Sequence, residues 1–167
     1  MKTRIYNEGQ LIKERLAEIS DYIYNNPELG NEEYKAVEAL TTFLKEHNFQ
    51  VECPIADMDT AFKATFDSGK PGMTIGYLCE YDALPKIGHG CGHNMIGVMS
   101  AGAGVALSKV LDEIGGKIIV YGTPAEETNG GKVILAEAGV FDELDAAMIV
   151  HPDGETRASG SSSALYP

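Results

Sequence analysis

The first part of the chain has the hydrophobic periodicity of two amphipathic helices. Apolar side chains recur at helical spacing over residues 9–25, and Pro27 follows the last of them. A second helix is expected after Asn31, a suitable N-cap, with an apolar stripe that includes Leu40 and Leu44. The pattern therefore predicts that two helices precede the first strand.

From residue 62 onward, short apolar runs alternate with helical patterns and glycine-containing loops. Residues 62–66 alternate between apolar and polar side chains, whereas three later runs are apolar throughout and favour strands buried on both faces. The buried strands are expected at residues 73–79, 117–122 and 146–150, and the helices between them at about 94–114 and 131–138. This order predicts an α/β fold with helices packed on the faces of a sheet.

Composition narrows the class of protein. With 167 residues, 44% of them hydrophobic and 23% charged, the chain can bury a core, and it has no apolar run long enough to cross a membrane. Its net charge of -12 argues against nucleic acid or an anionic membrane as a partner, because both require basic patches. An odd count of three cysteines and the lack of a visible secretory signal indicate free thiols and a cytoplasmic location.

The side chains best suited to bind a metal follow the three predicted buried strands. In open α/β sheets, ligands bind beyond the carboxyl ends of the strands, so these side chains should lie at one edge. Cysteine, histidine and glutamate together suit zinc or a similar borderline ion. The residues are Glu80, Asp82, His89, Cys91 and His93 after the first strand, Glu126 and Glu127 after the second, and His151 after the third.

Each of these features has a simpler explanation when taken alone. A cysteine and a histidine at the Cys91-x-His93 spacing often occur together by chance, and adjacent glutamates are usually a solvated pair. His151 can be an ordinary residue at a strand end. Gly102-x-Gly104 resembles half of a dinucleotide-binding motif, but it lies within a predicted helix, where close helix packing is the better interpretation. The joint occurrence of the other features at successive strand ends favours a metal site.

The ligand types also indicate a reaction. A pair of divalent ions needs a bridging group, which a thiolate or a solvent hydroxide can supply, and the ions can polarise an amide carbonyl. A carboxylate outside the ligand set can accept the proton of the attacking water and pass it to the leaving nitrogen. Because adjacent glutamates outside a helix point in different directions, Glu126 and Glu127 can divide these two roles between them.

Several sequence blocks resemble one known superfamily. They are EYDALP at residues 80–85, GHGCGHN at 88–94, GTPAEE at 122–127 and DAAMIVHP at 145–152. In this order they are similar to the metallo-aminoacylase and carboxypeptidase superfamily. Within it they resemble the amidohydrolase branch of N-acyl-amino-acid, auxin-conjugate and aminobenzoyl-glutamate hydrolases. The resemblance implies an α/β fold with a mixed central sheet flanked by helices, like the catalytic domain of zinc exopeptidases, here incomplete.

The same resemblance implies roles for individual residues. Glu126 is expected to be the general base and acid, and Asp82 is expected to orient a ligand beside the metals. His89 belongs to the motif without being a ligand, and is expected to contact substrate or to shape the loop. The cofactor would be two divalent ions, with zinc the default and manganese or cobalt the alternatives. The expected metal ligands are Cys91, His93, Glu127 and His151.

The function implied is a metal-dependent hydrolase acting through a metal-bridged hydroxide. Its small-molecule substrate would be an N-acyl amino acid, an aminobenzoyl-glutamate-like conjugate or a dipeptide. Asn94 stands where the commoner family pattern has aspartate, which favours the aminobenzoyl-glutamate and dipeptide classes. The alternative is a non-catalytic metal-binding or interaction fragment of such an enzyme. A zinc nucleobase deaminase is disfavoured because its Pro-Cys-x-x-Cys block is absent from the sequence.

Length is the main departure from this superfamily. Its members are longer, and a smaller lid or dimerisation domain interrupts their catalytic domain, through which the full-length protein would form a homo-oligomer. We therefore expect residues 1–152 to be the first part of a discontinuous catalytic domain and 153–167 a linker toward that second domain. No histidine follows His151 in this sequence to complete the shell of a second metal.

Overall fold

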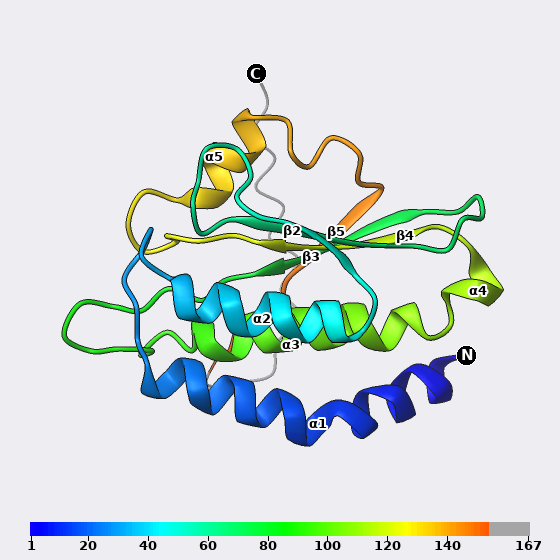
Figure 1. Ribbon diagram of the computed structural model, residues 1–167, viewed down its shortest axis with the longest axis horizontal. Helices are drawn as coiled ribbons and strands as arrows, with labels where there is room; N and C mark the ends of the chain where they lie inside the picture. The colour runs from blue at the N-terminus through cyan, green and yellow to red at the C-terminus, as the bar shows by residue number, and fades with distance from the viewer. Residues whose placement is uncertain (154–167) are drawn as a thin grey trace.

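The computed structural model describes residues 1–153, which form a sheet with helices on both of its faces (Figure 1). The predicted linker lies, apart from Asp153, outside the described residues. The helices are α1 (Lys2–Asn25), α2 (Tyr34–Glu46), α3 (His93–Ser108), α4 (Leu111–Ile114) and α5 (Gly131–Glu137). The strands are β1 (Gln50–Glu52), β2 (Phe62–Asp67), β3 (Thr74–Cys79), β4 (Lys117–Gly122) and β5 (Ala146–Met148).

The five strands form one mixed sheet in the order β1-β2-β4-β3-β5. β1, β2 and β4 pair antiparallel, whereas β3 pairs parallel with both β4 and β5. Cys79 at the end of β3 lies opposite Gly122 at the end of β4, so the two strands end together. The predicted α/β fold with a mixed sheet flanked by helices is confirmed.

Helices α1, α2 and α3 lie on one face of the sheet and α5 on the other (Figure 1). α3 packs on the central strands and α1 covers α3. Glycines in α3 allow both α1 and the sheet to approach it closely. A Cβ on Gly102 would come 2.5 Å from Leu16 of α1, and one on Gly104 would come 2.7 Å from Val120 of β4. The two glycines of the partial dinucleotide motif therefore serve helix packing, as the sequence indicated.

The main hydrophobic core fills the space between the sheet and helices α1 to α3. Its centre is β4, whose side chains Ile118 and Val120 are fully buried. A smaller cluster of Met58, Ala61 and Leu135 lies beneath α5. Burial of this size on the central strands holds their carboxyl ends in a defined position, which is where the candidate site is built.

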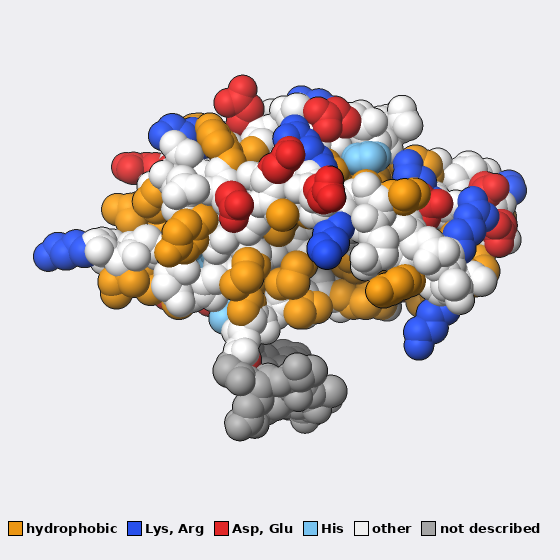
Figure 2. Space-filling model, turned by 90° about the horizontal axis from the view of Figure 1, so that it is seen from below, with side chains coloured by type: hydrophobic (Ala, Val, Ile, Leu, Met, Phe, Trp, Pro, Cys, Tyr) orange, Lys and Arg blue, Asp and Glu red, His pale blue; other side chains and the backbone are white. Residues whose placement is uncertain are grey.

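The face covered by α1 has a mixed surface. Figure 2 shows acidic, basic and apolar side chains interspersed across it, with no continuous basic patch in this view. Tyr6, Leu11 and Tyr22 are among the apolar side chains that α1 exposes. No helix among residues 1–153 is both long enough and apolar enough to cross a membrane.

The start of α2 differs from the prediction. Asn31 is not the N-cap: it has a left-handed backbone, with φ of 70°, and the helix begins after Glu33. The free N–H groups of the first turn are instead satisfied by the Glu28 side chain, which accepts from Lys35 N (2.8 Å) and Ala36 N (3.1 Å). A carboxylate from the preceding turn thus replaces the expected cap.

The strand predicted at residues 146–150 is also corrected. β5 covers only Ala146–Met148 and all three residues are exposed, whereas a strand buried on both faces was expected. Among the described residues it is the outermost strand of the sheet and pairs with β3 alone. β3 itself is only partly buried, and the helix expected at 94–114 is divided into α3 and α4.

Candidate metal centre

The predicted site residues lie at the edge of the sheet where β3, β4 and β5 end. A hydrogen bond from Thr123 N to the Cys79 carbonyl (2.8 Å) ties the ends of β3 and β4 together, and the Thr123 hydroxyl donates to the same carbonyl at 3.0 Å. Glu80 follows Cys79 directly, and the Glu126-Glu127 loop follows Thr123. The parallel register therefore brings sequence-distant acidic residues to one place, as the strand order requires.

His93 is the first residue of α3 and is 1% exposed. Gly92 before it adopts a left-handed backbone (φ 77°), and a Cβ there would lie 3.0 Å from Met95 and 3.1 Å from Pro152. His93 Nδ1 lies 2.9 Å from Asp82 Oδ1, and the other Asp82 oxygen accepts from Glu127 N at 2.9 Å. Because a carboxylate only accepts, Nδ1 donates and Nε2 faces the site.

The electrostatic surroundings favour the charged forms of His93 and Asp82. Burial alone would lower the pKa of His93, but the hydrogen bond and charge of Asp82, with the charges of Glu80 and Glu127, raise it overall. Burial would raise the pKa of Asp82, but its hydrogen bonds with His93 and Glu127 N lower it. Asp82 is therefore an ionised group that orients His93 and at the same time positions Glu127.

One potential ligand group consists of Cys91, His93 and Glu127, whose ligand atoms all lie within 4.8 Å of one another. The Cys91 thiol is hydrogen-bonded to Glu127, which together with burial and nearby acidic charges raises the pKa of the thiol to about 11. A metal ion at this point would replace the thiol proton, since the thiolate is the form that binds metals.

A second potential ligand group consists of Glu80, His93 and His151, again with ligand atoms within 4.8 Å. His93 Nε2 lies 3.3 Å from Glu80 Oε2, a buried oxygen that has no hydrogen-bond partner among the described residues. The other Glu80 oxygen pairs with the Lys132 ammonium. His151 is exposed, its Nδ1 donates to the Pro152 carbonyl (2.7 Å), and its ring stands perpendicular to that of His93, with centroids 5.8 Å apart.

Both groups depend on the same nitrogen of His93. Since Asp82 holds Nδ1, only Nε2 can bind a metal, and one nitrogen binds one ion. A second ion at this edge would have to be held without His93, either by Cys91 and Glu127 or by Glu80 and His151. A thiol, two imidazoles and two carboxylates, one of which has an unpartnered buried oxygen, form a donor set that suits zinc or a similar divalent ion.

Glu126 belongs to neither ligand group and its side chain is exposed. The backbone before Glu126 is anchored by the buried Glu33 carboxylate, which accepts a hydrogen bond from Ala125 N at 2.7 Å. Glu33 also accepts from the Thr60 hydroxyl at 2.7 Å. Ala125 has a left-handed backbone (φ 58°). Of the two adjacent glutamates, Glu127 therefore belongs to a potential ligand group and Glu126 does not.

Three other residues of the recognised motifs lie near the site. His89 is buried and belongs to neither ligand group; it lines a cavity beside the site. Asn94 donates to Ser20 Oγ at 3.0 Å and so joins α3 to α1. Glu80 was expected at a strand end but not among the metal ligands, and its ion pair with Lys132 was not predicted because Lys132 lies outside the recognised blocks.

Comparison with known proteins finds homologues of this chain. The Xaa-Arg dipeptidase of Mus musculus is 40% identical over 162 residues, covering 87% of this chain and 36% of the mouse protein. A p-aminobenzoyl-glutamate hydrolase subunit of Escherichia coli is 36% identical over 160 residues, covering 84% of this chain and 33% of that protein. The chain thus spans about a third of the length of these curated relatives. No protein-family model matches the chain.

Solved structures show the same fold. A putative aminohydrolase from methicillin-resistant Staphylococcus aureus superposes with a TM-score of 0.78 at 28% identity, covering 88% of this chain and 41% of its own. A dinuclear metal binding peptidase of the M20 family from Bacillus subtilis, at 23% identity and a TM-score of 0.73, covers 83% of this chain and 42% of its own. The chain is homologous to the metallo-aminoacylase and carboxypeptidase superfamily, which confirms the resemblance seen in its motifs.

Proposed function

We propose that the chain carries part of the active site of a metal-dependent amide hydrolase. The observation that supports this most directly is the convergence of Cys91, His93 and Glu127 within 4.8 Å, around a histidine whose other nitrogen is held by a buried carboxylate. The proposed substrate is an N-acyl amino acid, an aminobenzoyl-glutamate-like conjugate or a dipeptide. The names of the relatives at 36–40% identity support the dipeptide and the aminobenzoyl-glutamate classes.

In this proposal the metal ligands are Cys91, His93, Glu127 and His151. Glu80 joins them as a further candidate, because its unpartnered oxygen lies 3.3 Å from His93 Nε2. Two divalent ions, zinc by preference, would polarise the amide carbonyl and acidify the attacking water. Side chains of this chain would carry out the proton transfers and position the metal ligands.

Glu126 is the proposed general base and acid. As an exposed carboxylate next to a ligand, it can take a proton from the attacking water and deliver it to the leaving nitrogen. Asp82 is a positioning residue: it keeps the proton of His93 on Nδ1 and anchors the backbone of Glu127. The Glu33 carboxylate accepts a hydrogen bond from Ala125 N and so fixes the backbone directly before Glu126.

Zinc titration of the purified chain tests the ligand assignment. We expect Cys91→Ser and Glu127→Ala to weaken zinc binding strongly, whereas Glu126→Gln should bind zinc like the parent because it belongs to neither ligand group. Asp59→Asn, an exposed acidic position outside both groups, is the control for a general loss of negative charge. Equal zinc affinity in the parent and in Glu127→Ala would refute the assignment.

Hydrolysis assays test the reaction. In the smallest protein that contains this chain and shows turnover, Glu126→Gln should abolish release of the amino acid while keeping the zinc content. Full turnover in that variant would remove Glu126 from its proposed role. Zinc binding without turnover in any longer protein that contains this chain would favour the alternative, a non-catalytic metal-binding module.

A further inference from the structure

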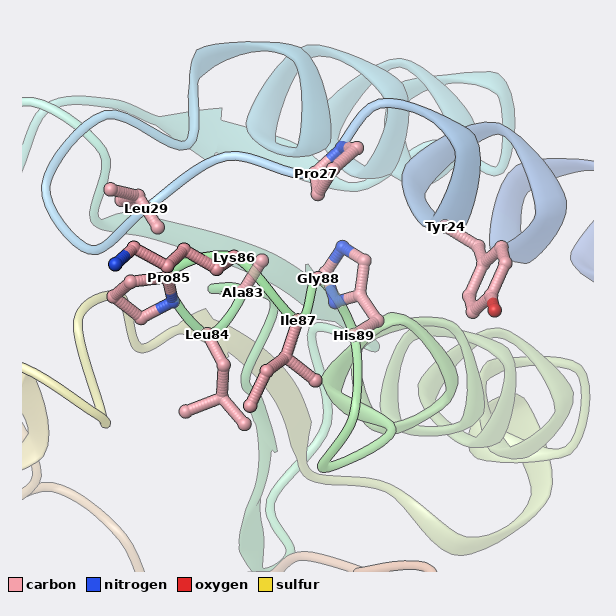
Figure 3. A pocket seen from close by; sticks show the side chains of 10 residues that line it. All are labelled: Tyr24, Pro27, Leu29, Ala83, Leu84, Pro85, Lys86, Ile87, Gly88 and His89. Atoms are coloured by element: carbon pink, nitrogen blue, oxygen red, sulfur yellow. The ribbon is translucent and has the colours of Figure 1, made fainter.

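A cavity of about 640 Å³ lies beside the candidate metal centre, between the end of α1 and the loop that follows β3 (Figure 3). One wall comes from the segment between α1 and α2, the other from residues 83–89. The backbone hydrogen bond from Ala83 N to the Glu28 carbonyl (2.8 Å) joins the two walls. This volume is in the range of small-molecule sites. The lining residues are Tyr24, Pro27, Leu29, Ala83, Leu84, Pro85, Lys86, Ile87, Gly88 and His89.

His89 is the polar group in this cavity that most needs a partner. It is 7% exposed, and neither ring nitrogen makes a hydrogen bond with any of the described residues. Burial lowers the pKa of His89, and the nearby Ile23 backbone partly offsets this effect without forming a well-aligned hydrogen bond to the ring. Figure 3 shows the ring between Pro27 and Tyr24, pointing into the space between the two walls. Since an unpaired buried polar group is costly, a ligand atom at this point would be stabilised.

The charge of the lining selects the kind of ligand. Lys86 is the one lining residue among the ten with a permanent charge, and Figure 3 places its side chain beside Leu29 and Pro85, at the end of the cavity away from Tyr24. An imidazole keeps at least one N–H donor in any tautomer. An ammonium and an N–H donor on apolar walls favour a hydrogen-bond acceptor that is neutral or anionic, and they disfavour a cation.

The cavity and the candidate metal centre share one loop. Asp82 contacts His93, and the next residue, Ala83, already lines the cavity; His89 lines it and Cys91 follows two residues later. A substrate whose amide lay at the metal centre could therefore extend one of its two flanking groups along this loop into the cavity.

We propose that this cavity is the subsite for a flanking group of the substrate, namely an apolar group that carries a neutral or anionic hydrogen-bond acceptor. The acceptor pairs with His89, the apolar part packs on Pro27 and Leu29, and Lys86 excludes cationic groups. The inference rests on the proposed amide hydrolase for the identity of the occupant, whereas binding in the cavity can be measured without metal or turnover.

Two matched fragments test the cavity by NMR. The metal-free, isotope-labelled chain is titrated with 3-phenylpropanoate and with 3-phenylpropylamine, which share the aromatic body and differ in charge. We expect saturable amide shifts in residues 24–29 and 83–89, with the amine binding roughly tenfold more weakly, the effect of one charge-assisted hydrogen bond. No saturable binding, shifts confined to other regions, or equal affinity for both fragments would overturn the proposal.

Variants connect binding to the named side chains. His89→Phe keeps the size of the ring and should weaken 3-phenylpropanoate binding roughly tenfold. Lys86→Glu, an exposed position, should reverse the preference between the two fragments, and it remains informative if His89→Phe fails to fold. Parent-like affinities in both variants would refute the assignment.

The last comparison separates this proposal from the proposed function. Glu127→Ala should lose zinc but keep parent-like binding of 3-phenylpropanoate, because Glu127 is not a lining residue. In an active protein the fragment should raise KM for the substrate without changing kcat. Cavity binding with purely non-competitive inhibition would refute the substrate subsite, whereas absence of turnover with intact cavity binding would count against the hydrolase alone.

Discussion

Replacement of Asp82 by asparagine is the sharpest test of how the site is organised. The Asp82 side chain is 0% exposed and accepts two hydrogen bonds, from His93 Nδ1 and from Glu127 N, each of 2.9 Å. Asparagine has the same shape but offers one acceptor and one donor group. One of the two N–H groups would therefore face an NH₂, or His93 would move its proton to the nitrogen that faces the site.

The magnitude follows from these two contacts. Leaving one buried donor without a partner costs about 1–3 kcal/mol of stability in the metal-free chain. Loss of a carboxylate that orients a ligand histidine typically weakens metal binding about 10- to 100-fold, or about 1.4–2.8 kcal/mol. We expect Asp82→Asn to show both effects, whereas Asp112→Asn, an exposed position on α4, should show neither.

The pH dependence of stability gives a further test, because its direction can be predicted. The pKa of Asp82 is below its ordinary value in the folded chain, so its contribution to stability is present above the ordinary pKa and is lost as the pH falls through the lowered one. The acid side of the stability profile should therefore be shallower in Asp82→Asn. Urea unfolding over a pH series and competition with a colorimetric zinc chelator measure the two quantities. A folded Asp82→Asn chain with parent-like zinc affinity would refute the positioning role.

Three further predictions concern the surroundings of the site. A Cβ on Gly131 would lie 2.1 Å from a backbone oxygen of the preceding loop, so Gly131→Ala should cost about 1–3 kcal/mol in urea unfolding. Gly9→Ala, where the Cβ would meet nothing within 4 Å inside α1, should raise stability by about 1 kcal/mol instead; equal effects would contradict the packing argument. Burial raises the pKa of Glu33, so the parent should lose stability relative to Glu33→Gln as the pH rises through that raised pKa, and a flat difference across the pH series would count against it. Lys132→Met leaves Glu80 without its ammonium partner and should destabilise the metal-free chain by about 1–3 kcal/mol, a loss that added zinc should reduce; a loss unchanged by zinc would argue against Glu80 as a ligand.

Local patterns were sufficient for most of the elements. The apolar run at Lys117–Gly122 predicted β4 with its observed bounds, because both faces of this strand are covered and every residue after Lys117 is buried. The run at 146–150 was equally apolar, yet β5 is exposed. Hydrophobicity predicts that a strand forms, whereas its position in the sheet decides whether its faces are covered.

The same distinction applies to the start of α2. Asparagine is a residue type favoured at N-caps, so Asn31 was the expected cap. The helix instead begins after Glu33, because the Glu28 side chain caps its first turn from the preceding segment. The choice between two possible caps depends on the path of the chain between α1 and α2, which no local preference specifies.

At the site, the sequence alone determined which residue types follow each strand, and strand order made their meeting at one edge predictable. Only the tertiary structure decided that Asp82 joins His93 to Glu127, that Glu80 pairs with Lys132, and that His89 faces a cavity. The physical reason is range: helical and strand periods are set by neighbouring residues. These contacts instead join positions up to 52 residues apart, and their geometry depends on strand register and on the packing of α3 and α5.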